Sequence, residues 1–218
     1  TGDNPARWRA HLDHLLPMLT KVRAVKHHPA LPHAEIADFM AHLESREGVA
    51  ARALAFTILT AARSGETRGA TWAEIDLDAK VWTNRGNRMK AGKEHRVPLS
   101  TAALSLLSEK RDEYQLVFES EVKRGKAISD MSMTAVLRRT EHVDITAHGF
   151  RSTFRDWVGE ATGFPREVIE AALAHGIKDK AEAAFARSDL FDKRRGLMAA
   201  WSNFAWSSER SDNVVSIS

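Results

Sequence analysis

The chain has 218 residues, of which 43% are hydrophobic and 28% are charged. A chain of this length and composition can form a hydrophobic core, which excludes an intrinsically disordered protein. No apolar stretch approaches the roughly 20 residues that a membrane-spanning helix needs, and no signal-peptide pattern is found at the start. Cysteine is absent, which excludes disulfides and zinc sites with thiolate ligands and suits a cytoplasmic protein.

The formal net charge of +3 is a mild basic bias, and the distribution of charge matters more than its total. Lysines and arginines gather within residues 85–96 and again at residues 193–195. Such runs commonly form solvated faces, so on their own they give only weak support for nucleic-acid binding.

The first 30 residues differ in their sequence pattern from the rest of the chain. Residues 4–16 predict a short amphipathic helix that Pro17 ends, and the stretch that follows has no clear period. We therefore expect residues 1–30 to hold a linker and the remnant of a preceding domain, residues 31–206 to form the main domain, and residues 207–218 to be a polar tail.

The main domain alternates between helical and strand patterns. Apolar residues at helical spacing predict one helix over residues 36–43 and a second over residues 54–62. Two short segments rich in β-branched or aromatic residues, 81–83 and 95–99, predict a small antiparallel sheet. Further helices are predicted over residues 102–110, 132–139, 149–161, 165–174, 180–187 and 190–204. The expected fold class is mostly α with a small antiparallel β-sheet (α+β).

Two basic residues in the first half of this domain are candidates for catalytic residues. Arg63 ends an otherwise apolar segment, and a guanidinium in apolar surroundings needs an anionic partner. A salt bridge to Glu66 or Asp76 would supply one, and so would a bound phosphate. Lys90 lies on a predicted β-turn, where a lysine is usually just solvated; neighbouring positive charge would lower its pKa and let it protonate a leaving oxygen.

Two histidines and an arginine in the second half are further candidates. His148 and Arg151 are spaced i, i+3 at a helix start, where helix amides would help them to bind phosphate. Equally, His148 could cap the helix while Arg151 pairs with Asp144. His175 follows an amphipathic helix and precedes a glycine, so a helix cap also explains it. Ten residues later lies Phe185, for which an ordinary core position is the plain alternative.

Taken in order, these segments resemble the tyrosine recombinases, or phage-type integrases, and they are similar to the integrases of prophages and genomic islands. The family pattern is an arginine in an Arg-x-Gly-Glu box, a lysine on a β-turn, His-x-x-Arg, a histidine or tryptophan, and then a tyrosine. The positions that match it are Arg63, Lys90, His148, Arg151 and His175, with Phe185 in place of the tyrosine. Tyr114, the only tyrosine of the chain, precedes His148 and does not fit the pattern.

The resemblance implies the tyrosine recombinase catalytic-domain fold over residues 31–206, preceded by a DNA-clamping domain. In the family, a tyrosine oxygen attacks a DNA phosphate and leaves a 3′-phosphotyrosyl link and a free 5′-hydroxyl. The two arginines and His175 would stabilise the phosphorane, His148 would assist proton transfer at the nucleophile, and Lys90 would protonate the departing 5′ oxygen. With Phe185 at the nucleophile position, engineered or natural, we expect this chain not to cleave DNA.

The resemblance also implies the partners of the protein. The expected partner is double-stranded DNA, on which the full-length protein would form a tetramer with accessory DNA-bending or excision factors. The expected DNA contacts are Arg88, Lys93 and Arg96. Neither a cofactor nor a metal is expected, and the protein would act on the nucleoid in the cytoplasm. Three alternatives stay open: a natural DNA-binding module of the same fold that has lost catalysis, a metal-dependent nuclease using some of the histidines, and a helical scaffold.

Overall fold

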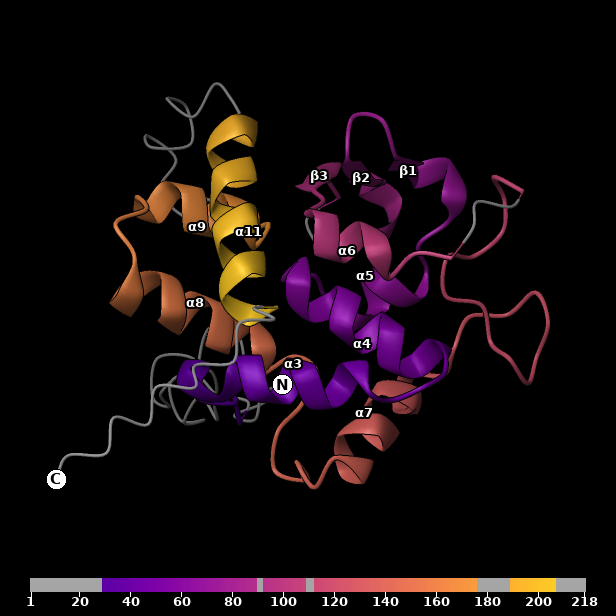
Figure 1. Cartoon of the computed structure of the whole chain (residues 1–218). Helices are drawn as coiled ribbons and strands as arrows, with labels where there is room; N and C mark the ends of the chain where they lie inside the picture. Colours follow the sequence, from indigo (N-terminus) through magenta and orange to yellow (C-terminus); the bar gives the residue numbers. More distant parts are fainter. Residues whose placement is uncertain (1–28, 90–91, 109–111, 176–188, 207–218) are drawn as a thin grey trace, which may run out of the picture.

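The computed structural model describes residues 29–89, 92–108, 112–175 and 189–206. This part of the chain is mostly helical, with one small antiparallel sheet at the edge of the molecule, which confirms the predicted fold class (Figure 1). Among these residues no helix has both the length and the apolar character needed to cross a membrane. Several predictions lie outside the described residues: the helix over 4–16 with its linker, Lys90, the helix over 180–187 with Phe185, and the polar tail.

The centre of the molecule is helix α4 (Val49–Leu59), which is buried along almost its whole length. It packs against α3 (Ile36–Glu44), which a short 3-10 turn precedes, and contacts several of the helices that follow it along the chain. The apolar spacing predicted both helices. Apart from the partly exposed Arg52, α4 is apolar on nearly every side, so other elements must cover nearly all of it, and the fold is built around this helix.

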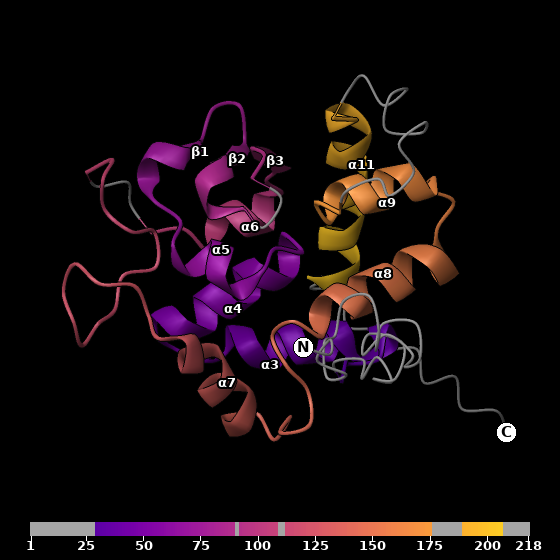
Figure 2. The same cartoon turned by 180° about the vertical axis from the view of Figure 1, so that it is seen from behind.

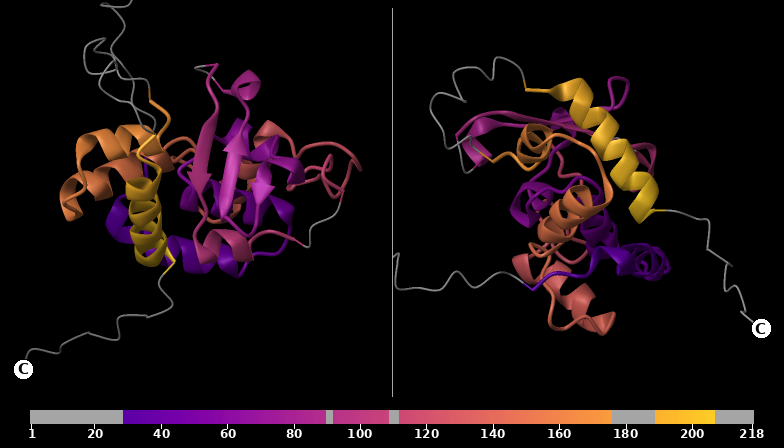
Figure 3. Two further views of the ribbon diagram at one scale, coloured as in Figure 1. Left: turned by 90° about the horizontal axis from the view of Figure 1, so that it is seen from above. Right: turned by 90° about the vertical axis from the view of Figure 1, so that its left-hand side faces the viewer.

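The sheet covers one side of α4 and has the strand order β1-β2-β3 (Figure 3). Strand β2 (Val81–Asn84) pairs antiparallel with β1 (Ile75–Asp76) and with β3 (His95–Pro98), which confirms the two predicted strands. The buried Trp82 of β2 contacts Phe56 of α4, with 5.3 Å between ring centroids. Strand β1 has only two residues, too few to show a period in the sequence.

The other helices mostly follow the predictions, with shifted ends. They are α5 (Ser64–Arg68), α6 (Thr101–Ser105), α7 (Asp130–Arg139), α8 (Phe150–Ala161), α9 (Arg166–Ala172) and α11 (Phe191–Ala205). Helix α5 was not predicted, because its five residues include no large apolar side chain and so show no helical period. Pro165 is the N-cap of α9 rather than a residue of its first turn.

Helix α11 joins the two halves of the domain, because it contacts both α9 and β3 (Figure 2). On α8, Trp157 packs at a tilt against Trp201 and stacks on Phe204, both of α11, at centroid separations of 5.1 and 5.2 Å. The indole Nε1 of Trp201 also donates to the carbonyl of Ile58 on α4, at 2.9 Å. The last helix is therefore fixed on the core by aromatic packing and by a buried hydrogen bond.

The start of α8 is held against the first residues that the structure describes. The hydroxyl of Thr153 donates to the Leu31 carbonyl at 2.6 Å. Gly149, the N-cap of α8, lies so close to Pro29 that a Cβ atom would come within 2.1 Å of the proline carbonyl oxygen. Only glycine fits this approach of two backbones.

We predict that Gly149→Ala lowers the free energy of unfolding by roughly 1–3 kcal/mol, because a backbone segment must move. The matched control is Gly159→Ala in the same helix, where no atom lies within 4 Å of the new Cβ. That change should raise stability by about 0.5–1 kcal/mol, as alanine does at an open helical position. Urea denaturation of both variants measures the difference, and equal effects at the two positions would contradict this account of the helix start.

Candidate active site

Arg151 lies in the first turn of α8, and its side chain is buried, with 6% of the residue exposed. Its Nη1 donates to the carbonyl of Ala61, and its Nη2 donates to the carbonyl of Leu173 at 2.5 Å. These carbonyls stand at the C-terminal ends of α4 and α9. Because the C-terminal end of a helix carries partial negative charge, the two ends together offset the burial of the guanidinium.

The ends of α4 and α9 have the same construction. Ala61 and Ala174 each adopt a left-handed conformation with φ 49°, and the amides around them close the same pair of hydrogen bonds onto the last helical turn. This is the Schellman motif, which turns the chain sharply away from the helix axis. The first turn leads within two residues to Arg63, and the second leads directly to His175. Two predicted site residues therefore stand beside the carbonyls that hold Arg151.

Arg63 is the N-cap of α5, not the end of the apolar helix as expected, because the turn at Ala61 has already ended α4. Its Nη1 lies 2.7 Å from Oε1 of Glu66, and its backbone N–H donates to Oε2 of the same carboxylate at 3.0 Å. One of the two predicted salt bridges is thus present. Glu66 is buried, whereas a quarter of the Arg63 side chain is exposed. The carboxylate therefore holds one edge of the guanidinium while another part reaches solvent.

The His175 ring lies between Arg151 and a carboxylate. Its Nε2 is 3.3 Å from Nη2 of Arg151, and its Nδ1 is 2.7 Å from Oε2 of Glu170. The other oxygen of Glu170 accepts from Arg155 at 2.9 Å, so the carboxylate is itself fixed. A carboxylate on Nδ1 sets the tautomer and the orientation of the ring. With 39% of its side chain exposed, His175 can also meet a ligand from solvent.

The pKa of Arg151 follows from its burial and from the nearby positive charge. Burial, and then the charge of Arg63, lower the pKa of Arg151 to about 10. Arg151 therefore stays protonated at neutral pH, the guanidinium of Arg63 is near enough to act on it by charge, and the exposed His175 lies beside it. An arrangement of this kind attracts a multiply charged oxyanion such as phosphate.

The remaining predicted residues differ in where they lie and in what they contact. His148 is exposed and lies in the turn before α8, so it is not on the helix with Arg151, whose amide donates to the His148 carbonyl. Lys93 is exposed at the hairpin between β2 and β3. The Arg88 guanidinium pairs with Glu74, which is buried. Lys90 and Phe185 lie outside the described residues.

One residue that sequence reasoning missed is His95, the first residue of β3. Its ring lies beside the carbonyl of Ala172 and is close enough to Arg151 and Glu66 to feel their charges. Burial, and then the positive charge of Arg194, lower the pKa of His95 to about 4. The alternation of the strand could have revealed it, because a residue two positions before the buried Val97 faces the same side.

Comparison with known proteins decides the family. The family model described as "Phage integrase family" matches residues 29–185. The chain belongs to the phage integrase family. It is 33% identical to the prophage integrase IntA of Escherichia coli (strain K12) over 162 residues, which cover 72% of this chain and 39% of that protein. It is 30% identical to the integrase of Enterobacteria phage P4 over 200 residues, which cover 82% of this chain and 46% of that protein.

Solved structures agree with the fold of a tyrosine recombinase catalytic domain. The integrase from mycobacterium phage Brujita is similar with a TM-score of 0.57 at 14% identity, over 81% of this chain and 59% of that one. The Tn1549 transposon integrase in complex with circular intermediate DNA has a TM-score of 0.53 at 15% identity, over 84% and 69%. The integrase chain spans 39–50% of the length of the curated relatives that it matches.

We predict that His95 makes the stability of the domain depend on pH. Its folded-state pKa of about 4 lies below the ordinary value of 6.5, so between these values the unfolded chain binds more protons than the folded chain. The free energy of unfolding should therefore fall as the pH is lowered through this window. In His95→Gln, which cannot titrate, urea denaturation at several pH values should give a shallower fall. Parallel curves for the two proteins would contradict the burial of a neutral His95.

Proposed function

We propose that the full-length protein is a site-specific recombinase that breaks and rejoins double-stranded DNA through a 3′-phosphotyrosyl intermediate. The observation that carries this proposal is the cluster of Arg63, Arg151 and His175 at the ends of α4 and α9. Membership of the phage integrase family supports it, as does the similarity in fold to a transposon integrase described in complex with circular intermediate DNA.

The cluster suits the transition state of phosphoryl transfer. When an oxygen attacks the phosphate, negative charge grows on the non-bridging oxygens, and donors that are already oriented stabilise it without reorganisation. Arg63 and Arg151 supply forked donors that are charged at any working pH, and His175 supplies a hydrogen bond. By resemblance to the family, we assign His148 to proton transfer at the nucleophile and Lys90 to protonation of the 5′ oxygen.

We propose that Phe185 occupies the position of the nucleophile, so that this chain binds DNA without cleaving it. The position follows His175 by ten residues and is the last one that the family model matches. A benzyl side chain has the shape of tyrosine but no oxygen to attack phosphorus. A similar solved structure is a form of the Tn1549 integrase in which one tyrosine is replaced by phenylalanine, in complex with transposon right end DNA.

We further propose how the protein meets DNA. Lys93 and Arg96 are both exposed on the hairpin that carries Lys90, so they are our candidates for contacts with the DNA backbone. We assign Arg88 a structural role rather than a DNA contact, because Glu74 already neutralises its charge. The full-length protein would act as a tetramer on DNA, with accessory DNA-bending or excision factors, on the nucleoid in the cytoplasm.

We predict that Phe185→Tyr in the full-length protein creates a covalent DNA adduct that the Phe185 form does not make. The substrate is a duplex with a nick close to the cleavage site, which lets the short product leave and traps the 3′-phosphotyrosyl link. A denaturing gel should show a shifted band that protease removes. Both proteins should bind the duplex in fluorescence anisotropy, with an affinity that falls as salt rises, because phosphate contacts release counterions.

The matched control is Tyr114→Phe in the Phe185→Tyr background, since Tyr114 is the chain's only tyrosine and is 79% exposed. The control should leave the adduct unchanged, and a lost adduct would place the nucleophile at Tyr114. Salt-dependent binding without an adduct from Phe185→Tyr would instead support a DNA-binding module that has lost catalysis. Failure to bind duplex DNA even at low salt would overturn the proposed function.

A further inference from the structure

His175 is held twice by Glu170, once through the backbone and once through the side chains. The His175 N–H donates to the Glu170 carbonyl at 2.9 Å, within the turn that ends α9. In the ring, Nδ1 lies 2.7 Å from Oε2 of Glu170, a separation typical of the strong hydrogen bonds that charged groups form. One edge of the ring is therefore fixed to the helix that the chain has just left.

The carboxylate of Glu170 has a second partner on α8. Its Oε1 accepts from Nη2 of Arg155 at 2.9 Å, and only 22% of the Glu170 side chain is exposed. A carboxylate that pairs with a guanidinium is ionised, and an ionised carboxylate can only accept hydrogen bonds. Both oxygens of Glu170 are thus acceptors, one for Arg155 and the other for His175.

These partners determine where the protons of the His175 ring lie. Because the carboxylate of Glu170 only accepts hydrogen bonds, Nδ1 must carry a proton. Because a guanidinium only donates, Nε2 must offer a lone pair to Nη2 of Arg151, which lies 3.3 Å away. In this arrangement His175 is therefore neutral, with its single ring proton on Nδ1.

The two contacts of the ring differ in strength. The separation of 3.3 Å from Arg151 lies just beyond the usual range for an N–H hydrogen bond, whereas the contact with Glu170 lies at its short end. Nη2 of Arg151 also donates to the carbonyl of Leu173, at only 2.5 Å. A ligand can therefore replace the weak contact at Nε2 while the strong contact at Nδ1 persists.

The neutral ring cannot donate a hydrogen bond to a phosphate oxygen. Phosphate oxygens only accept, and the edge of His175 beside Arg151 carries no proton. To donate, Nε2 must take up a proton from solvent, which makes the ring an imidazolium with an N–H group on each edge. The imidazolium then stands between two anions, the carboxylate of Glu170 and the phosphate, and both favour its charged form.

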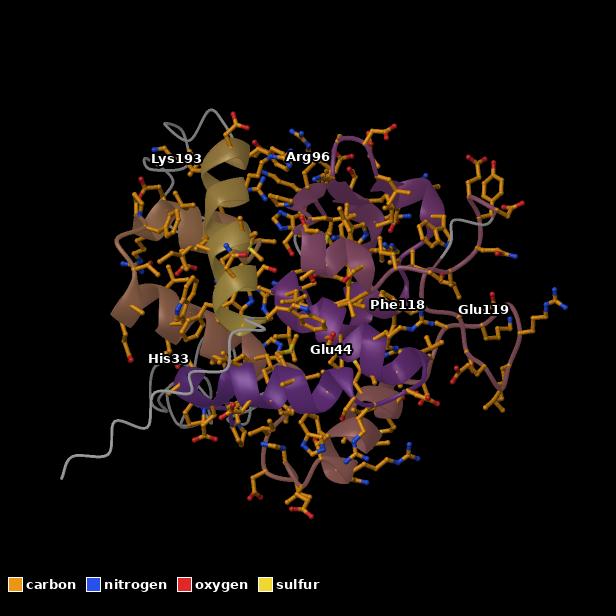
Figure 4. The ribbon with its side chains drawn as sticks, viewed as in Figure 1. His33, Glu44, Arg96, Phe118, Glu119 and Lys193 are labelled. Atoms are coloured by element: carbon orange, nitrogen blue, oxygen red, sulfur yellow. The ribbon has the colours of Figure 1, made fainter. Side chains whose placement is uncertain are left out.

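The other charged side chains nearby have partners of their own. Arg63 pairs with the buried Glu66. On α11, which packs on α9, Arg194 donates to Asp189 at 2.9 Å. On β3, Arg96, which is labelled in Figure 4, lies 3.5 Å from the same carboxylate. Among the described residues, the carboxylate on α9 is the one that contacts the histidine ring.

We propose that Glu170 is a positioning residue that keeps the ring proton of His175 on Nδ1, so that His175 hydrogen-bonds the phosphate only after Nε2 has taken up a proton from solvent. The inference rests on the proposed function, in which a DNA phosphate meets Arg63, Arg151 and His175. It makes the contribution of His175 to the covalent step depend on pH, and it makes Glu170 the residue that sets this dependence.

The first experiment tests the tautomer and needs no DNA. NMR of the chain with isotope-labelled histidine nitrogens, above about pH 8, distinguishes a protonated ring nitrogen from an unprotonated one. His175, assigned by the signals that His175→Ala removes, should carry its proton on Nδ1. In Glu170→Gln, the amide oxygen keeps the contact with Arg155 and the amide NH2 faces Nδ1, so the proton should move to Nε2. Glu167→Gln, a matched change at an exposed position of α9, should leave His175 unaltered.

The second experiment measures what His175 contributes to the covalent step. It compares single-turnover adduct rates on the nicked duplex with and without His175→Ala, in full-length protein with Phe185→Tyr as the parent. In the parent, His175→Ala should slow the reaction by about 100-fold near pH 6 and by less than about 10-fold near pH 9, where Nε2 has lost its proton. In Glu170→Gln, whose neutral ring can donate from Nε2, the factor should be similar at both pH values.

Two results would overturn the inference. One is a parent chain in which the neutral His175 carries its proton on Nε2. The other is a factor for His175→Ala that does not change with pH in the parent, or that changes equally in Glu170→Gln. Both measurements on the parent stand even if Glu170→Gln fails to fold. Absence of any adduct from the parent is a separate result, because it removes the proposed function while the spectra still decide whether Glu170 sets the tautomer.

Discussion

The structure depends on one buried cation, the guanidinium of Arg151, placed between two helix ends. Burial of a guanidinium is unfavourable unless hydrogen bonds and negative potential replace the lost water. The carbonyls of Ala61 and Leu173 supply both, and in return they are held at a fixed separation. Because α4 is the centre of the core and α9 packs on α11, this contact also fixes the two halves of the domain relative to each other.

The same contact places the rest of the candidate active site. The left-handed turns at Ala61 and Ala174 send the chain from the two helix ends to Arg63 and His175. Each of these side chains is then held on one edge by a carboxylate, Glu66 for the arginine and Glu170 for the histidine. A side chain that is held on one edge keeps its orientation and leaves another edge open to a ligand. The site is thus organised before any phosphate arrives, which is the condition for electrostatic catalysis.

Much of this arrangement could be predicted from the sequence, because it depends on residues that are close together in the chain. Apolar spacing predicted α3, α8 and α11, and the β-branched segments predicted β2 and β3. The ordered motif predicted Arg63, Arg151 and His175, which the structure brings together.

The remaining features depend on contacts between distant parts of the chain. Helix α5 and strand β1 are too short to show a period. The burial of His95 and the pairing of Asp189 with Arg194 and Arg96 become visible only when α11 packs on β3. The sequence also could not show that Arg151 is a structural residue as well as a candidate for catalysis. Its partners are backbone carbonyls, which every residue has, so no particular residue type marks them.

The double role of Arg151 makes Arg63 the better place to test the central claim, which is that the cluster acts by neutralising the charge of the phosphate. The measurement is the adduct rate of Arg63→Ala, in full-length protein with Phe185→Tyr, on two nicked duplexes. One carries an ordinary phosphodiester at the cleavage site, and the other carries an uncharged methylphosphonate there. We expect the variant to lose cleavage of the phosphodiester by about 100-fold or more and to recover most of it on the methylphosphonate, where there is less charge to neutralise. An equal defect on both substrates would contradict the claim and would show that Arg63 has a structural role instead.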